Sequence, residues 1–96
     1  MYTIYVTFKC RPAMREAFVE RVKQEGILDK IRNEDGCHRY DYYFSAEDDT
    51  KLLLLEAWES KRHQEIHMTQ PHMADLRAFN DDYIESAAFG EYELKS

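Results

Sequence analysis

The sequence is poor in the features that define disulfide-bonded, membrane-spanning and nucleic-acid-binding proteins. It has two cysteines, Cys10 and Cys37, in 96 residues, too few for a disulfide framework, and neither has a neighbourhood that predicts a reactive thiol. Its longest apolar run is the four leucines at 52–55, whereas a membrane helix needs roughly 20 apolar residues. Lys and Arg number 13 against 19 Asp and Glu, a net charge of −6. Nucleic acid and anionic membranes are therefore poor partners.

Several catalytic motifs are also missing. The sequence has no glycine-rich phosphate loop, no Gly-x-Ser-x-Gly, no His-Glu-x-x-His and no Cys-x-x-Cys, which disfavours nucleotide-driven, hydrolytic and thiol-redox chemistry. The acidic loop over 45–50 lacks the spaced ligands and central glycine of a calcium loop. The first residues show no basic and then apolar signal pattern, so we expect a cytoplasmic protein.

Hydrophobic periodicity predicts a strand followed by a helix in the first third of the chain. Apolar and polar side chains alternate over residues 2–9, which is typical of a strand. Apolar residues then recur at every fourth position from Met14 to Val22, which predicts an amphipathic helix. Gly26 interrupts this pattern, a further turn or two follows over 27–31, and Asp35-Gly36 predicts the turn that ends it.

Two strands of a hairpin are predicted next. Residues 38–44 alternate, which places His38, Tyr40, Tyr42 and Phe44 on one face. Residues 51–58 form the antiparallel neighbour, and their run of leucines indicates a strand covered on both faces.

The last third of the chain predicts a broken helix and a final strand. Ser60 is a plausible N-cap, and Pro71 marks a second helix start. Apolar residues from Met73 to Tyr83 recur at helical spacing, and residues 87–94 predict a short strand at an edge of the sheet.

These elements predict one α+β domain over residues 1–96. A right-handed crossover and a hairpin favour an antiparallel sheet with the helices on one face. The other apolar face of the sheet must then be covered, and a second copy of the chain is the simplest cover. We therefore expect a homodimer through the sheet faces.

Two motifs resemble the antibiotic biosynthesis monooxygenase (ABM) domain, in wording nearest to its small quinol monooxygenase branch. The first is Leu55-Glu56-Ala57-Trp58-Glu59-Ser60, followed by His67 and by Thr69-Gln70-Pro71-His72-Met73. The second is Glu34-Asp35-Gly36-Cys37-His38-Arg39-Tyr40, at the entry to the second strand. The resemblance implies a ferredoxin-like fold, a dimeric α+β barrel, and oxygen insertion without a metal or flavin cofactor.

A cofactor-free oxygenase needs a base that deprotonates a hydroxyaromatic substrate, and a dry aromatic wall. We predict His67 as the base or as a donor that orients the substrate, with His72 as a second candidate; Trp58, Tyr40, Tyr5 and Phe79 are the predicted substrate-binding residues. The expected partners are a small aromatic substrate and dioxygen. Structural roles stay open for these residues: a hydrogen-bonded helix histidine for His67, capping or packing for His72, and a core position for Trp58.

Other functions stay open. His63 and His67, with Glu59 one turn earlier, have the spacing of metal ligands, although such pairs are common by chance and the family requires no metal. A sister branch that isomerises a phosphorylated dione shares the Thr-x-Pro-His-like stretch but has a histidine where this chain has Gln24-Glu25-Gly26. Haem-degrading relatives use a first-strand Asn that this chain lacks. A non-catalytic binding or stress-response module is the remaining alternative.

Overall fold

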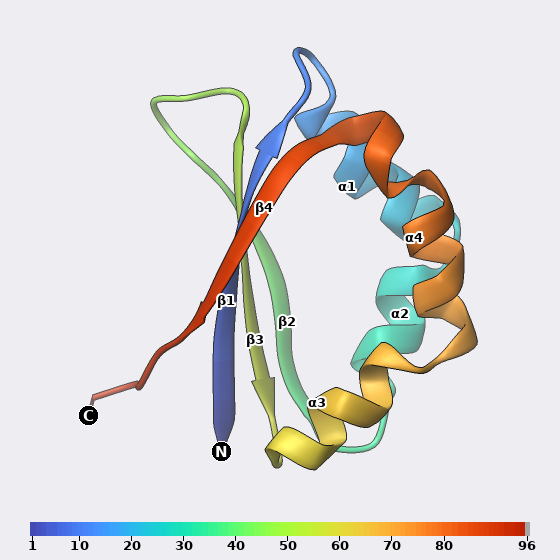
Figure 1. Ribbon diagram of the computed structural model, residues 1–96, viewed down its shortest axis with the longest axis vertical. Helices are drawn as coiled ribbons and strands as arrows, with labels where there is room; N and C mark the ends of the chain where they lie inside the picture. Colours follow the sequence, from blue (N-terminus) through green and yellow to red (C-terminus); the bar gives the residue numbers. More distant parts are fainter. Residues whose placement is uncertain (96) are drawn as a thin grey trace.

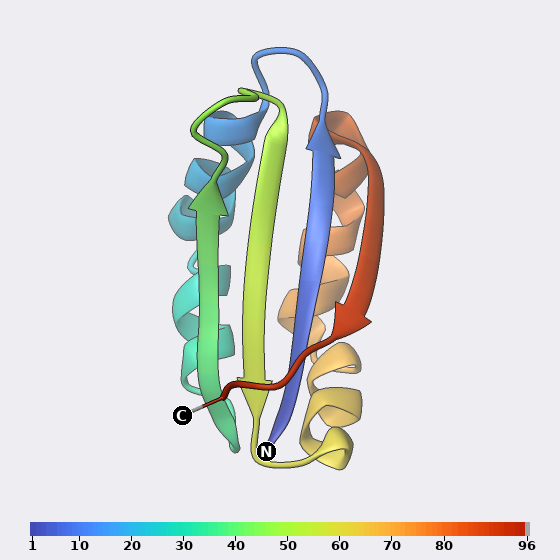
Figure 2. The ribbon, with the colours of Figure 1, turned by 90° about the vertical axis from the view of Figure 1, so that its left-hand side faces the viewer.

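A four-stranded antiparallel sheet carries all the helices on one of its faces (Figure 1). The computed structural model describes residues 1–95 and has the strand order β2-β3-β1-β4. Its elements are β1 (Tyr2–Cys10), α1 (Arg15–Gln24), α2 (Ile27–Arg32), β2 (Cys37–Phe44), β3 (Lys51–Trp58), α3 (Lys61–Met68), α4 (Pro71–Tyr83) and β4 (Ile84–Glu91). The predicted order of strands and helices is confirmed. The opposite face of the sheet carries no helix (Figure 2).

The central strands owe their two faces to the alternation seen in the sequence. On β3, Leu52, Leu54, Glu56 and Trp58 are buried beneath the helices, whereas Leu53 and Leu55 on the helix-free face are half-buried. Antiparallel pairing places directly opposite residues on the same face, so Ile4 of β1 lies beside Glu56 under the helices. The helix-facing side of the sheet is therefore the floor of the core.

Two breaks in the helical layer occur where the sequence predicts them. Gly26 separates α1 from α2 and has a φ of 74°, a left-handed conformation that glycine adopts without steric cost. The Ser60 hydroxyl accepts a hydrogen bond from the His63 backbone N–H at 3.3 Å and caps α3. Pro71 occupies the first turn of α4, where its missing N–H costs nothing. The two breaks let short helices wrap the sheet as an arc.

A β-bulge corrects the predicted faces of the second strand. Cys37 pairs with Trp58 and Arg39 pairs with Ala57, so His38 is an extra residue on β2. Cys37, and not His38, therefore lies on the same face as Tyr40. The side chain of His38 is exposed and hydrogen-bonds the carboxylate of Glu59.

The final strand begins earlier than predicted. β4 starts at Ile84, directly after α4, and ends at Glu91, whereas we expected a strand over 87–94. Its predicted edge position is confirmed. Residues 92–95 leave the strand and cross the helix-free face of the sheet (Figure 2), where the Tyr92 N–H donates to the Thr3 carbonyl at 3.2 Å.

The core lies between the sheet and the helices. Phe18 of α1 is its aromatic centre, with the rings of Tyr42 and Phe79 at centroid distances of 6.2 and 6.4 Å. Cys10 and Cys37 lie at opposite ends of the sheet, and burial raises the pKa of both thiols, that of Cys37 to about 11. Within residues 1–95, every helix is too short or too polar to span a bilayer.

Candidate active site

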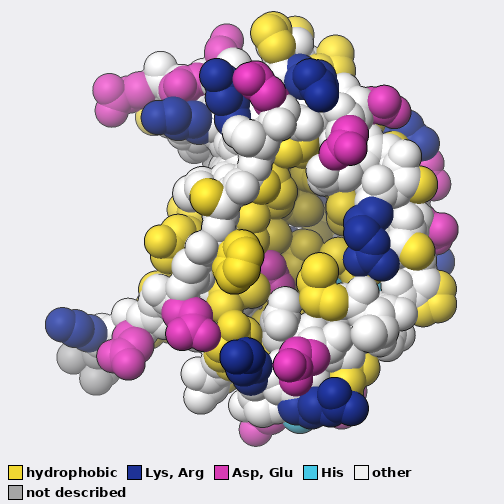
Figure 3. Space-filling view, in the orientation of Figure 1, with side chains coloured by type: hydrophobic (Ala, Val, Ile, Leu, Met, Phe, Trp, Pro, Cys, Tyr) yellow, Lys and Arg dark blue, Asp and Glu magenta, His cyan; other side chains and the backbone are white. Residues whose placement is uncertain are grey.

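A cavity of about 690 Å³ lies between the sheet and the helical arc. In the space-filling view it is a deep hollow whose interior is mainly hydrophobic (Figure 3). Charged side chains at its margin are Lys61, Glu65, Arg77 and Glu91. Its wall includes Tyr2, Ile4, Phe18, Tyr40, Tyr42, Leu54, Glu56, His67, Met73, Leu76 and Phe89. A site with apolar walls and few polar groups suits a small, largely apolar ligand.

His67 is the imidazole that reaches this cavity. It sits in the last turn of α3, and its side chain is 1% exposed. Its Nδ1 lies 2.8 Å from Oε2 of Glu34, so the ring N–H donates to the carboxylate. No group within residues 1–95 hydrogen-bonds the other nitrogen, Nε2, which is left for the cavity. Burial lowers the pKa of His67, although the bond to Glu34 opposes the shift, so the imidazole is neutral at pH 7.

Glu34 binds both predicted histidines with one oxygen. His72, in the first turn of α4, places its Nε2 2.8 Å from Oε2 of Glu34, the same atom that His67 contacts. A turn holds the Glu34 backbone: its N–H donates to Ile31 and its carbonyl accepts from Cys37. A carboxylate that accepts from an imidazole N–H fixes the tautomer and the orientation of the ring. The structure therefore joins His67 and His72 through a residue that the sequence analysis did not assign to the site.

Aromatic rings enclose the imidazole of His67. The Trp58 indole lies against it with ring centroids 4.6 Å apart and planes at 33°, and the Tyr40 ring meets it at 5.7 Å. Trp58 is fully buried, and its Nε1 donates to Oε1 of Glu56 at 3.0 Å. Tyr40 lines the cavity as predicted, whereas Trp58 lies beneath the cavity wall and supports His67.

Glu56 is a buried acid that the sequence analysis also missed as a site residue. It is 5% exposed and lines the cavity. Burial raises its pKa to about 7, although the hydrogen bond from Trp58 opposes the shift. The signal was present in the sequence: in a strand of period two, Glu56 lies on the same face as Leu54 and Trp58. Glu56 is therefore a proton donor or acceptor inside the cavity at neutral pH.

Two of the predicted substrate-binding residues lie away from the cavity. Tyr5 is on the helix-free face, because it alternates with the buried Ile4, and it packs over Gly90. Grouping Tyr5 with His67 was therefore wrong, since the sheet separates them. Phe79 is buried in the core against Phe18 and is not part of the cavity wall.

The alternative metal-ligand set of Glu59, His63 and His67 does not assemble. Glu59 pairs with His38, whereas His63 hydrogen-bonds the Ser60 hydroxyl at 2.7 Å and lies 3.4 Å from Asp35. His63 is half-buried, because its ring packs under Gly36. His67 turns instead toward Glu34.

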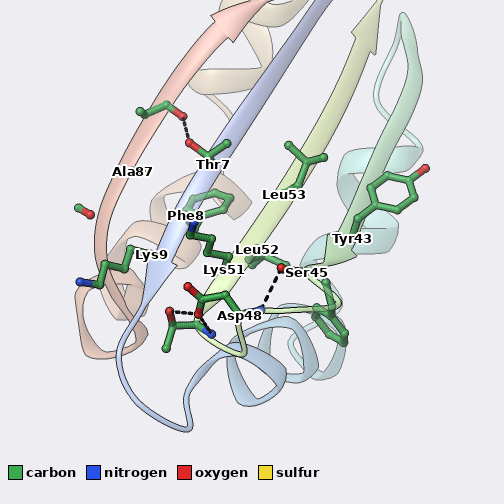
Figure 4. A pocket seen from close by; sticks show the side chains of 14 residues that line it. Thr7, Phe8, Lys9, Tyr43, Ser45, Asp48, Lys51, Leu52, Leu53 and Ala87 are labelled. Carbon is green, nitrogen blue, oxygen red and sulfur yellow. Dashed lines mark hydrogen bonds between the residues drawn. The ribbon is translucent and has the colours of Figure 1, made fainter.

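A second hollow, of about 770 Å³, lies at one end of the helix-free face (Figure 4). Thr7, Leu53 and Tyr43 line it from three strands, beside Ser45 and Asp48 of the loop between β2 and β3. Its polar groups largely satisfy one another: Thr7 Oγ1 donates to the Ala88 carbonyl, and Asp48 accepts from Thr50. It has no histidine and none of the predicted site residues among its lining, so it is the weaker candidate for an active site.

Fold and cavity together define a ferredoxin-like α+β protein with a ligand site between the sheet and its helices. Solved structures of the same architecture include an ABM protein from Nitrosomonas europaea (TM-score 0.85, 26% identity, 97% of both chains) and Rv0793 from Mycobacterium tuberculosis (TM-score 0.79, 28% identity, 99% of this chain and 95% of that one).

The sequence comparisons give the family. The protein-family model described as "Antibiotic biosynthesis monooxygenase" matches residues 1–78, and the chain belongs to this family. Among curated relatives, "Putative monooxygenase Rv0793" of M. tuberculosis is 35% identical over 75 residues, covering 78% of this chain and 71% of that protein. "Probable quinol monooxygenase YgiN" of Escherichia coli K12 is 28% identical, covering 88% and 90% of the two chains.

Proposed function

We propose that this protein is a cofactor-independent monooxygenase that oxidises a small hydroxyaromatic or quinol substrate with dioxygen. The observation that carries the proposal is the neutral imidazole of His67, held by Glu34 at the wall of a largely apolar cavity. The names of the relatives Rv0793 and YgiN support the reaction class.

His67 acts as the base in this proposal. Its Nε2 accepts the proton of a substrate hydroxyl, while Glu34 holds Nδ1–H and stabilises the imidazolium that forms. The resulting anion is electron-rich enough to reduce dioxygen. With a 1,4-quinol, one oxygen atom forms a new C–O bond on the ring and the other leaves as water. The substrate supplies all four electrons and becomes a hydroxyquinone.

The cavity supplies the dry environment that this chemistry requires. Tyr40 is buried and Tyr42 is half-buried, and desolvation raises the pKa of both phenols, so they remain neutral donors. Apolar walls exclude water, which would otherwise solvate the substrate anion and weaken its reactivity. Glu56 adds a second exchangeable proton within the same space.

The charge of the cavity argues against a phosphorylated substrate, as the isomerase alternative would require. Lys61 and Arg77 face the three acids Glu56, Glu65 and Glu91. This balance offers no concentrated positive field for a phosphate dianion. The monooxygenase proposal therefore fits the cavity better than the isomerase does.

We also propose that the protein is a homodimer through its helix-free sheet face. Leu53 and Leu55 are half-buried there, and Tyr5 and Tyr43 are 36% and 41% exposed. Covering apolar surface is worth about 25 cal/mol per Å². A second sheet would bury these side chains at once.

Oxygen uptake with a 1,4-quinol tests the function. Untagged protein in chelator is assayed against a protein-free control, and the product formed under ¹⁸O₂ is analysed by mass spectrometry. We expect protein-dependent uptake with one ¹⁸O atom per product, a loss of about 10²-fold or more in kcat for His67→Ala, and wild-type rates for His38→Ala. Ligand binding without turnover would instead support the binding module, and conversion without oxygen would support an isomerase.

A further inference from the structure

Glu34, His67 and His72 bring three potential metal-ligating atoms together beside the cavity. Each residue offers one ligand atom, and these three atoms all lie within 4.8 Å of one another. Nδ1 of His67 and Nε2 of His72 both contact Oε2 of Glu34. They come from the turn before β2, the end of α3 and the start of α4, so the fold positions each of them independently. The three side chains are between 1% and 11% exposed. This is a buried cluster of two imidazoles and one carboxylate.

The geometry is close to that of a bound divalent cation. Each imidazole nitrogen is 2.8 Å from the shared carboxylate oxygen. Zinc bonds of about 2.0–2.2 Å in a tetrahedral site separate neighbouring ligand atoms by roughly 3.3 Å. Small rotations of the side chains are therefore enough to admit an ion. The donor set of two nitrogens and one oxygen suits first-row transition metals and not magnesium or calcium, which prefer oxygen ligands.

We propose that Glu34, His67 and His72 form a binding site for one first-row divalent cation such as Zn²⁺, and that the bound ion inhibits the oxygenase. The first half of this proposal is independent of the activity. The second half rests on the proposed function, because it concerns the same imidazole of His67.

Inhibition follows from the two tautomers of His67. In the metal-free protein, Nδ1 carries the proton that Glu34 accepts, and Nε2 has the lone pair that faces the cavity. A metal ion on Nδ1 needs the lone pair there, so the proton moves to Nε2. A metal ion on Nε2 of His72 likewise needs the lone pair there, so the N–H of that ring lies on Nδ1. The cavity then faces an N–H donor that cannot accept a proton from the substrate.

The surroundings both favour and oppose the cation. Glu34 brings a negative charge with little exposure to water. Arg77 is the nearby positive charge that acts on His67, and its guanidinium is bound to the Met68 carbonyl at 3.3 Å. With three protein ligands, the ion keeps a position for water, as in open zinc sites.

Cobalt binding tests the site without any assay of activity. Co²⁺ is titrated into untagged, chelator-treated protein, and the visible absorption of the bound cobalt and the heat of binding are recorded. Zn²⁺ is then added to displace the cobalt, and Mg²⁺ serves as the control ion. We expect one Co²⁺ per chain, with affinity reduced more than about tenfold in Glu34→Gln and in His72→Ala and unchanged in His38→Ala. Circular dichroism checks the fold of each variant. No binding by the wild type, or equal binding by both ligand variants, would overturn the site.

Oxygen uptake in the presence of Zn²⁺ tests the inhibition. We expect the wild-type rate to fall in proportion to the occupancy measured with cobalt, and a chelator to restore it. The rate of each protein is first expressed relative to its own rate without metal. The Zn²⁺ concentration for half inhibition of His72→Ala should then exceed that of the wild type by the same factor as the variant's metal affinity falls. Full activity at full occupancy would overturn the inhibition. An inactive wild type in chelator would refute the proposed function, while the cobalt titration would still decide the site.

Discussion

Trp58 connects His67 and Glu56, two ionisable groups that line the cavity. The centroids of its indole and of the His67 imidazole lie 4.6 Å apart, and its Nε1 donates to Oε1 of Glu56 at 3.0 Å. A single buried side chain thus fixes the position of the proposed base and satisfies a buried acid. Stability and activity are consequently linked at this residue.

The buried carboxyl of Glu56 makes stability depend on pH. Its pKa is about 7 in the folded protein, against an ordinary 4.5, so between these values the folded state retains a proton that the unfolded chain releases. The free energy of unfolding therefore decreases as pH rises from about 4.5 to 7, by about 3 kcal/mol in all. Glu56→Gln removes this loss and should be more stable than wild type at pH 8 by roughly 2–3 kcal/mol, with a much smaller difference at pH 4.

Urea unfolding at pH 4, 6 and 8 measures this effect. Glu47→Gln, at an exposed position, is the matched control and should follow the wild type at each pH. A gap between Glu56→Gln and wild type that stays constant with pH would contradict the argument.

Glu34→Gln tests the carboxylate that holds His67. An amide oxygen can still accept a hydrogen bond, but it carries no charge to stabilise the imidazolium. We expect kcat of the proposed reaction to fall about 10- to 100-fold with KM nearly unchanged. Steady-state kinetics in chelator, with Glu47→Gln as control, gives both constants. A rise in KM at constant kcat would show that Glu34 contributes to binding and not to proton transfer.

Two glycines form a matched pair for a test of packing at the site. Gly36 and Gly26 have φ of 78° and 74°, so an alanine is strained at either position. An added Cβ at Gly36 would lie 2.4 Å from the His63 ring, whereas at Gly26 it meets nothing within 4 Å. Gly26→Ala should cost about 1 kcal/mol and Gly36→Ala at least twice as much. Chemical denaturation measures both, and equal costs would show that the His63 ring moves aside freely.

Leu55→Lys tests the proposed dimer. It places a charge in the middle of the helix-free face, where a second sheet would have to bury it. We expect the variant to be monomeric by light scattering coupled to size exclusion, at concentrations where wild type is dimeric. The control is Ile66→Lys, at an exposed apolar position on α3 that is 43% exposed. Dissociation by both variants, or by neither, would argue against this interface.

The sequence predicted the elements well because local signals determine them. Alternation over residues 2–9, the Ser60 cap and the Pro71 restart are all short-range patterns, and each marks the expected element. The bulge at His38 escaped prediction because an extra residue is visible only when β2 is paired with β3. The start of β4 was placed three residues too late because no glycine or proline separates β4 from α4.

The site was predicted only in part, because it depends on contacts between distant residues. His67 was found through its motif, but its partner Glu34 is 33 residues away, and nothing local links them. Alternation would have placed Glu56 inside the cavity and Tyr5 outside it, had the faces of β1 and β3 been compared. The roles of these residues in catalysis remain predictions.

The extra residue at His38 sets the phase of the strand that walls the cavity. A strand shows one face to the helices at every second residue, so the bulge allows Cys37 and Tyr40, an odd number of positions apart, both to point inward. If β2 instead paired regularly through all its residues, His38 included, only one of Cys37 and Tyr40 could face the helices. Deleting His38 would remove the bulge and bring Cys37 and Tyr40 two positions apart, so the tyrosine wall beside His67 would keep its face and only the contact of His38 with Glu59 would be lost.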